Sequence, residues 1–408
     1  MNNFIKLSFK IPDKNSSVVS MKNDVEALKL VFENGYLMCL IRYDFNERPL
    51  TLISPANGGD SVEMILMSFR NELWINGKLC DEEWPAGNRF YDIDDIITGD
   101  FEVKAELYEY TKKDEPTIID TFTNAEGWHP EENVFVGDCM PFYDEGRYHV
   151  LYLKDRRHHS SKWSLGAHQW AHISTNDFIN WQIHPLAVEI TDQSEASICT
   201  GSWIKHDGVH YLYYTVRNND FYEERFNNNS PASVHRSISH DGYHFEKDPD
   251  FSVTLSKNFH GPTARDPKII MDENGIFHML VTTTYMPEDR GCLAHLTSED
   301  LVNWTELNDP VYISDDPEQP ECPDCFKYGD YYYILGSIRG KAHYMYSRTA
   351  FKDWIIPDER VIPCSSVPKG AIWKDKVIFT GFNAIGGYGG SMTFTSAYQN
   401  DKGELIFE

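Results

Sequence analysis

The chain has 408 residues, of which 41% are hydrophobic and 14% aromatic, so it is long enough for one large domain with an appendage or for two domains. Its formal net charge of −26 argues against nucleic acid and anionic membrane surfaces as partners, because both attract basic patches; a neutral or cationic small molecule fits better. The sequence contains no run of about 18 apolar residues that would predict a membrane span.

The first residues lack the apolar core of a signal peptide, so a cytoplasmic location is expected. Eight cysteines are spread along the chain, which is typical of reduced thiols rather than of a small secreted disulfide framework. Cys322 and Cys325 have the CxxC spacing of redox and zinc sites. A structural zinc needs a second Cys or His pair at ligand spacing. We find no convincing second pair, so the sequence predicts neither a metal nor a cofactor.

Residues 1–125 are predicted to form an N-terminal β-sandwich. Strand-like runs at 28–32 and 36–41 flank the turn Asn34-Gly35, and further runs follow at 61–67 and 72–79. Strands at this spacing, with turn residues between them, are typical of a sandwich. The hairpin at 73–79 is similar to one found in concanavalin-like lectin sandwiches.

Residues 126–408 contain a pattern that is repeated five times, with units that begin near residues 138, 201, 266, 321 and 370. Each unit has an apolar strand, a Gly or Asp turn and an aromatic strand. Four-stranded repeats of roughly 50 residues indicate the blades of a β-propeller. The predicted fold class is therefore all-β, with a five-bladed propeller after the sandwich.

Three of the five units open with a carboxylate: Asp138, Asp266 and Glu321. The first strand of each propeller blade lines the central axis. We therefore expect these three side chains to meet at one end of the funnel, where they are candidates for shared chemistry. Each could instead be a structural carboxylate that caps a turn or pairs with an arginine.

These segments resemble glycoside hydrolase family 32, the five-bladed β-furanosidases, and through it the related families 43 and 68. The resemblance covers about residues 128–400 and rests on three motifs. They are Arg265-Asp266-Pro267, Glu321-Cys322-Pro323-Asp324, and a first-blade segment that begins Trp170-Ala171-His172. Together, the first two motifs at matching blade positions are fairly specific.

The resemblance implies that Asp138 is the nucleophile, Asp266 a transition-state stabiliser and Glu321 the acid/base of a retaining glycosidase. Arg265 would bind a sugar hydroxyl or fix a neighbouring carboxylate. Retaining hydrolysis places the two reacting carboxyl groups about 5–5.5 Å apart. The expected partner is a small carbohydrate, a β-linked fructoside or fructo-oligosaccharide; a homo-oligomer is left open.

Four further residues are candidate substrate contacts. Trp163, Trp170 and Trp203 could wall the sugar site, because sugar faces pack on aromatic rings, although aromatic residues also fill propeller cores. Thr200 stands where the family has the serine of a Phe-Ser pair. All four remain hypotheses at this stage.

The sequence departs from the family pattern around these residues. Gly137 replaces the asparagine before the nucleophile, and Leu153-Lys154 replaces a strand end that usually carries glutamine. The family's sandwich follows the propeller, whereas here it precedes it. The glycine-rich segment 386–390 is interpreted as a flexible turn of the last blade, because no helix pattern follows it.

Two alternative functions remain. An inverting arabinosidase or xylosidase of the family 43 type would use Asp138 as a general base, with carboxyl groups about 6.5–9.5 Å apart. A propeller without catalytic activity would only bind carbohydrate, with the sandwich as a second binding module. The Glu-Cys-Pro motif disfavours the first, and the presence of all three acids disfavours the second.

Overall fold

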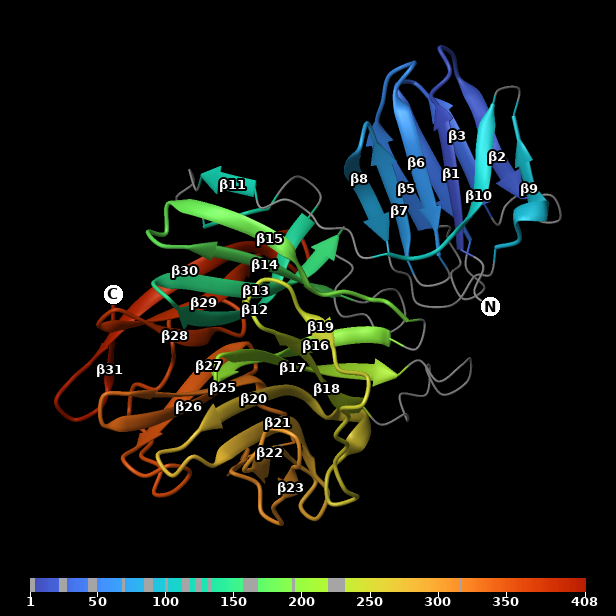
Figure 1. Cartoon of the computed structure of the whole chain (residues 1–408). Coiled ribbons are helices and arrows are strands. Elements are labelled where there is room, and N and C mark those ends of the chain that lie inside the picture. Colours follow the sequence, from blue (N-terminus) through green and yellow to red (C-terminus); the bar gives the residue numbers. More distant parts are fainter. Residues whose placement is uncertain are drawn as a thin grey trace. The chain divides into compact units, whose positions relative to one another are not determined.

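The computed structural model describes residues 4–21, 28–42, 50–67, 70–83, 91–99, 102–111, 118–121, 127–130, 134–156, 168–192, 195–218, 232–315 and 317–408. These residues fold almost entirely into antiparallel β-sheets (Figure 1). None of the helices in these ranges is long and apolar enough to cross a membrane. The prediction of an all-β fold is confirmed.

The chain divides into two compact units, the first of which ends at Lys113 apart from two short later segments. The sequence predicts a boundary between the sandwich and the propeller after residue 125. The difference arises because β11 (Ile118–Thr121) pairs with β15 (Asn180–Val188) in the second unit. The segment that looked like the end of the sandwich is thus an edge strand of the propeller.

The first unit is a sandwich of two five-stranded sheets, ordered β10-β1-β6-β7-β8 and β5-β4-β3-β2-β9. The strands are β1 (Phe4–Lys10), β2 (Ser16–Met21), β3 (Leu28–Glu33), β4 (Tyr36–Ile41), β5 (Leu50–Pro55), β6 (Ser61–Leu66), β7 (Asn71–Ile75), β8 (Lys78–Glu83), β9 (Ile96–Thr98) and β10 (Val103–Tyr108), with a 3-10 turn, η1 (Ile93–Asp95), before β9. Alternate residues of these strands point inward and form one apolar core.

The second unit is a five-bladed propeller, as predicted, and Figure 1 shows its blades in chain order from green to red. Blade I consists of β12 (Val134–Asp144), β13 (Arg147–Arg156), β14 (Gln169–Thr175) and β15. Blade II consists of β16 (Glu195–His206), β17 (Val209–Asn218), β18 (Ala232–Ser239) and β19 (Glu246–Lys247). Blade III consists of β20 (Arg265–Met271), β21 (Phe277–Tyr285), β22 (Arg290–Ser298), β23 (Thr305–Glu306) and β24 (Tyr312–Ile313), with η2 (Gly261–Thr263) before β20. Blades IV and V are β25 (Glu321–Tyr328), β26 (Tyr331–Ile338) and β27 (Lys341–Ser347), and β28 (Lys369–Trp373), β29 (Lys376–Ala384), β30 (Gly390–Gln399) and β31 (Leu405–Phe407).

The ring closes where the last blade meets the first. Val136 of β12 pairs with Gly390 of β30, and Trp128 forms a bridge with Met392, so blades I and V share one continuous sheet. The first strands of blades III, IV, V and I contact one another in that order. Closure therefore brings residues from opposite ends of the unit's sequence together beside the axis.

Polar side chains tie the inner strands to one another. Lys268 Nζ lies 2.6 Å from Oδ1 of Asp324, whose side chain is fully buried. The other oxygen of Asp324 accepts a 2.6 Å hydrogen bond from the N–H of Gly370. Lys369, also buried, donates to the carbonyl oxygen of Gly201 at 2.8 Å. Each of these contacts joins two blades, so they fix the positions of the inner strands.

Candidate active site

The three predicted carboxylates lie at matching irregularities of three inner strands. In blades I, III and IV the first strand has one residue more than its partner strand, within residues 136–139, 265–268 and 321–324. One-residue bulges of this kind re-aim side chains and are frequent beside active sites. The inner strand of blade V, β28, pairs without such a shift and carries no acid. The bulges thus occur in the same three blades as the carboxylates.

Asp266 and Cys322 lie within two of these bulges in a left-handed backbone conformation, with φ of 57° and 48°. Such a conformation costs a non-glycine residue about 1–3 kcal/mol, and it persists only where surrounding contacts fix it. Here the N–H of Cys322 donates a 3.0 Å hydrogen bond to Oδ2 of Asp266. The two strained residues therefore hold each other.

Cys322 also links Asp266 to Asp138. Its Sγ lies 3.5 Å from Oδ2 of Asp138, a distance at which a thiol acts as a weak donor. The second oxygen of Asp266 accepts a hydrogen bond from the hydroxyl of Thr200 on β16. Inner strands of four blades therefore meet around these two carboxylates.

Arg265 connects Glu321 to the same group. Its Nη2 donates to Oε1 of Glu321 at 3.0 Å, and its Nε lies 3.6 Å from Oδ2 of Asp266. The guanidinium is held from behind by Oε1 of Gln319 and by the carbonyl oxygen of Thr263. An unbroken series of contacts thus joins all three acids. Glu321 is the most open of them, with 56% of its side chain exposed, whereas Asp266 is 4% exposed.

The environment of Asp138 raises its pKa to about 6. Burial is the largest cause, followed by the negative charge of Asp266; the hydroxyl of Tyr388 and the charge of His168 act in the opposite direction. Burial also raises the pKa of the Cys322 thiol well above its usual value, so the thiol remains a donor. Asp138 therefore keeps its proton to a higher pH than an ordinary aspartate does.

The predicted substrate contacts turn out differently. Thr200 lies at the site, but its hydroxyl is bonded to Asp266. Trp170 is fully buried and its Nε1 donates to the carbonyl oxygen of Cys199 at 3.0 Å. Trp203 is 4% exposed and stacks on Phe142 with ring centroids 4.7 Å apart. These two indoles pack the core between blades and offer no face to a sugar; Trp163 lies outside the described residues.

Sequence reasoning missed three contributors to the site. Tyr388 donates to Oδ1 of Asp138 at 2.9 Å, Gln319 orients Arg265, and Cys322 bridges two carboxylates. The replacement of the family's asparagine by Gly137 was the available signal for Tyr388, because it leaves space next to Asp138 that another side chain can fill.

All eight cysteines are free thiols, and Cys322 and Cys325 do not form a disulfide. Across the described part of the chain, no group of three or more His, Cys, Asp or Glu side chains could hold a metal ion. The side chains that contact the three carboxylates are one guanidinium, two hydroxyls and the thiol of Cys322.

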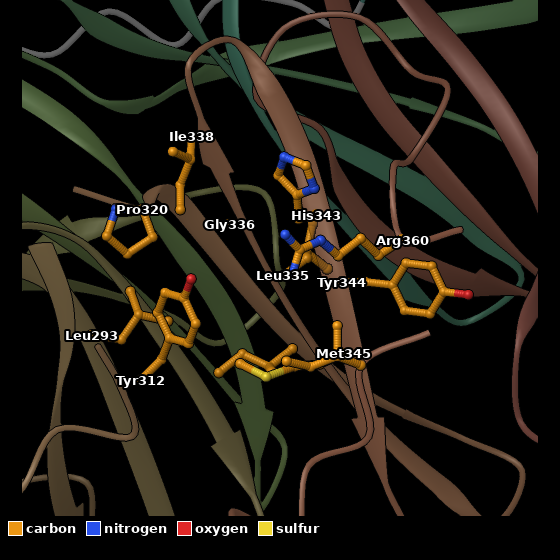
Figure 2. A pocket seen from close by; sticks show the side chains of 12 residues that line it. Leu293, Tyr312, Pro320, Leu335, Gly336, Ile338, His343, Tyr344, Met345 and Arg360 are labelled. Atoms are coloured by element: carbon orange, nitrogen blue, oxygen red, sulfur yellow. The ribbon is translucent and has the colours of Figure 1, made fainter. Parts of the chain in front are cut away.

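A separate groove lies between blades III and IV, and Figure 2 shows the side chains that line it. The lining residues are Leu293, Tyr312, Pro320, Ile334, Leu335, Gly336, Ile338, His343, Tyr344, Met345, Ile356 and Arg360. This lining is mainly apolar and contains none of the three acids. It lacks the paired carboxylates that glycoside hydrolysis requires.

Comparison with known proteins gives a consistent picture. Residues 128–355, more than half of the chain, match the N-terminal domain of glycosyl hydrolases family 32. Sucrose-6-phosphate hydrolase of Escherichia coli is 28% identical over 237 residues, which cover 57% of this chain and 46% of that protein. The chain thus spans less than half the length of this curated relative.

Solved structures show the same fold. A variant of fructan 1-exohydrolase IIa from Cichorium intybus, in complex with 1-kestose, matches with a TM-score of 0.57 and 16% identity, over 69% of this chain and 60% of that chain. A thermostable family-43 glycoside hydrolase matches with a TM-score of 0.51 and 16% identity, over 71% of this chain and 96% of that chain. The expected resemblance to family 32 and its relatives is confirmed.

Proposed function

Because the chain belongs to glycosyl hydrolase family 32, we propose that it hydrolyses a β-linked fructofuranoside with retention of configuration. Asp138 is the nucleophile, Glu321 the acid/base and Asp266 the stabilising carboxylate. The observation that carries the proposal is the series of contacts that joins these three acids through Cys322 and Arg265. The names of the relatives, which act on sucrose 6-phosphate or bind 1-kestose, support a fructoside as substrate.

In the first step, a carboxylate oxygen of Asp138 attacks the anomeric carbon of the fructosyl unit. A new C–O ester bond forms, the glycosidic C–O bond breaks, and its electron pair goes to the leaving oxygen. Glu321, in its protonated form, donates its proton to that oxygen. The products of this step are the free aglycone and a fructosyl ester of Asp138.

In the second step, water attacks the same carbon from the face that the leaving group vacated. Glu321, now a carboxylate, takes a proton from the water, and the ester bond to Asp138 breaks. Two displacements restore the original configuration, and both acids return to their starting states. The overall reaction consumes one water molecule and requires no metal or organic cofactor.

Asp266 acts on the sugar, whereas Arg265 acts on the acid/base Glu321. Asp266 is held by donors from Thr200 and Cys322, so its negative charge has a fixed place beside the nucleophile. A fixed carboxylate of this kind stabilises positive charge that develops on the sugar ring in the transition state. Arg265 keeps Glu321 next to this centre through the 3.0 Å contact.

The test is hydrolysis of a panel that contains sucrose, sucrose 6-phosphate, kestose, inulin and levan oligosaccharides, nitrophenyl arabinofuranoside and nitrophenyl xyloside. Wild type is compared with Asp138→Asn and Glu321→Gln, and methanol is added to trap the transferred sugar. We expect fructose release that both variants abolish, and methyl β-fructofuranoside as the methanol product. Cleavage of the arabinoside or xyloside alone, with inversion, would replace this proposal by the family 43 type. Activity that survives in both variants would rule out the three-acid site.

A further inference from the structure

The glycine-rich segment 386–390 of blade V brings one aromatic side chain against the nucleophile. The hydroxyl of Tyr388 donates to Oδ1 of Asp138 at 2.9 Å and accepts a 3.1 Å hydrogen bond from the N–H of the same residue. Two hydrogen bonds to one residue, one at the main chain and one at the side chain, fix both the position and the rotation of the carboxylate. The contact crosses the closure of the ring between blades V and I.

Gly137 and Gly389 leave room for this contact, because neither has a side chain. A Cβ atom on Gly137 would lie 2.5 Å from the hydroxyl oxygen and 2.9 Å from Cε1 of Tyr388, and 3.0 Å from the carbonyl oxygen of Leu153. A Cβ on Gly389, which has a φ of 80°, would lie 2.9 Å from Cβ of Phe135. Any larger residue at either position would collide with this arrangement, so the tyrosine occupies space that a side chain at position 137 would otherwise fill.

The ring of Tyr388 packs against a buried histidine that contacts an aspartate. His168 lies with its ring centroid 5.4 Å from that of Tyr388, and its Nε2 is 3.2 Å from Oδ1 of Asp155. Both of these side chains are only 1% exposed. Phe382 packs edge-on against the tyrosine at 5.3 Å. This packing restricts the ring of Tyr388, so its hydroxyl keeps its direction toward Asp138.

From these contacts we infer that Tyr388 is a positioning residue for the nucleophile, which replaces the side chain missing at Gly137 and leaves Oδ2 of Asp138 to attack the sugar. Among the described residues, Oδ1 carries the strong hydroxyl donor, whereas Oδ2 has only the weak thiol contact of Cys322 at 3.5 Å. An oxygen with uncommitted lone pairs is the better nucleophile. The role of Oδ2 in attack rests on the proposed function; the hydrogen bond itself does not.

The hydroxyl also acts on the charge of Asp138. A donor to the ionised form favours that form, so Tyr388 opposes the rise in pKa that burial and Asp266 cause. The titratable and charged groups that act on this carboxylate are Asp266 from β20, Glu321 and Cys322 from β25, His168 before β14 and Tyr388 before β30. Of these groups, Tyr388 can lose its donor with little other change, because Tyr388→Phe removes only the hydroxyl oxygen.

The experiment compares wild type with Tyr388→Phe, and Tyr148→Phe serves as the matched control. Tyr148 is likewise buried between blades I and V, but its hydroxyl bonds to the carbonyl oxygen of Ile378 at 2.9 Å and to Thr380 at 2.8 Å. Two quantities are measured: the pH dependence of kcat/KM, and the titration of the ¹³C carboxyl resonance of Asp138. The resonance is assigned by its loss in Asp138→Asn.

In Tyr388→Phe, we expect both midpoints to move to higher pH and kcat/KM at neutral pH to fall by roughly ten- to a hundredfold, the size expected for a hydrogen bond to a charged group. In Tyr148→Phe, neither midpoint should move. An unchanged carboxyl titration in Tyr388→Phe would overturn the inference. If the wild type cleaves no fructoside, the proposed function fails, while the carboxyl titration still decides whether Tyr388 controls Asp138.

Discussion

The main-chain N–H of Cys322 donates to Oδ2 of Asp266 at 3.0 Å, and both residues have a left-handed backbone. A peptide group of blade IV thus holds a carboxylate of blade III. The bulges in β20 and β25 make this contact, because each inserts one residue at the same level of its strand. The strain at one bulge is offset by the hydrogen bond to the other, so the two blades form one continuous surface at the candidate site.

Asp266→Asn should disrupt this surface. The two oxygens of Asp266 accept from the N–H of Cys322 and the hydroxyl of Thr200, and an amide can satisfy only one of these donors. We expect the free energy of unfolding to fall by about 1–3 kcal/mol and kcat/KM to fall at least about a hundredfold. Urea denaturation and steady-state kinetics measure the two effects.

The same substitution makes a prediction about Asp138. Because the charge of Asp266 helps to raise the pKa of Asp138 to about 6, its removal should move the carboxyl titration of Asp138 to lower pH. The control is Asp330→Asn, at an exposed turn of blade IV, which should leave that titration unchanged. A titration that stays in place in Asp266→Asn would contradict the proximity of the two acids.

Gly137→Ala should act through Tyr388. The new methyl group would lie 2.5 Å from the tyrosine hydroxyl, so it must push the hydroxyl away from Asp138. A displacement of this size next to a reacting group can cost about a hundredfold in rate. In the double variant Gly137→Ala/Tyr388→Phe, the loss in kcat/KM should be smaller than the product of the two single losses, because both remove the same hydrogen bond. Fully multiplicative losses would show that the two residues act independently.

Sequence patterns predicted the structure well where one or two residues decide local geometry. Asn34-Gly35 and Asn76-Gly77 both have positive φ values, as a two-residue hairpin requires. Three blades also share one turn directly after the third strand, in which a Ser or Thr hydroxyl donates to an Asp two residues later. The pairs are Thr175 with Asp177, Ser239 with Asp241 and Ser298 with Asp300. Repetition of such local units is what allowed the blades to be counted.

Contacts that join distant parts of the chain were not predictable in this way. Asp138 and Tyr388 are 250 residues apart, and Tyr388 belongs to no repeat, so no pattern pairs them. The sequence also left open whether Trp170 and Trp203 face the sugar site or the core, because it does not show which way an aromatic side chain points; both are buried. The acids were predicted to lie together because they open three of the five repeated units.

Lys268→Met should strongly destabilise the propeller. It would leave Asp324, whose side chain is fully buried, without the lysine that lies 2.6 Å away. An uncompensated buried charge costs about 3–5 kcal/mol. The matched control is Arg339→Met, which breaks an exposed pair with Glu318 and should change the free energy of unfolding little. Equal shifts of the urea midpoint in the two variants would show that the buried pair has no special role.

Buried histidine pairs recur in two blades. In blade I, His172 pairs with Leu151 of the neighbouring strand, and His149 lies two residues before Leu151. In blade III, His295 pairs with Leu280, and His278 lies two residues before Leu280. The ring nitrogens are 3.0 Å apart in the first pair and 2.8 Å apart in the second. Two adjacent imidazoles can share a hydrogen bond only if at least one ring nitrogen is unprotonated, so each pair requires a neutral histidine.

Acid should therefore destabilise the propeller before its carboxylates are protonated. Burial is the main cause that lowers the pKa of His149 to about 3 and that of His295 to about 4. These values lie below the unfolded value of about 6.5, so the unfolded chain binds protons first as the pH falls. The stabilisation is complete above pH 6.5 and is lost as the pH falls from 6.5 to about 4 for His295 and to about 3 for His149, at up to about 1.4 kcal/mol per group for each pH unit. Asp138, whose pKa is raised, acts in the opposite direction but is a single group.

Urea midpoints between pH 7.5 and 4.5 measure this dependence. His295→Gln keeps a hydrogen-bonding side chain beside His278, but glutamine cannot be protonated. The slope of the unfolding free energy against pH should therefore fall by up to about 1.4 kcal/mol per pH unit, the value for one proton. His206→Gln, at the surface of blade II, is the control and should leave the slope as it is in wild type. A slope that is the same in His295→Gln and wild type would mean that the buried pair of blade III does not control acid stability.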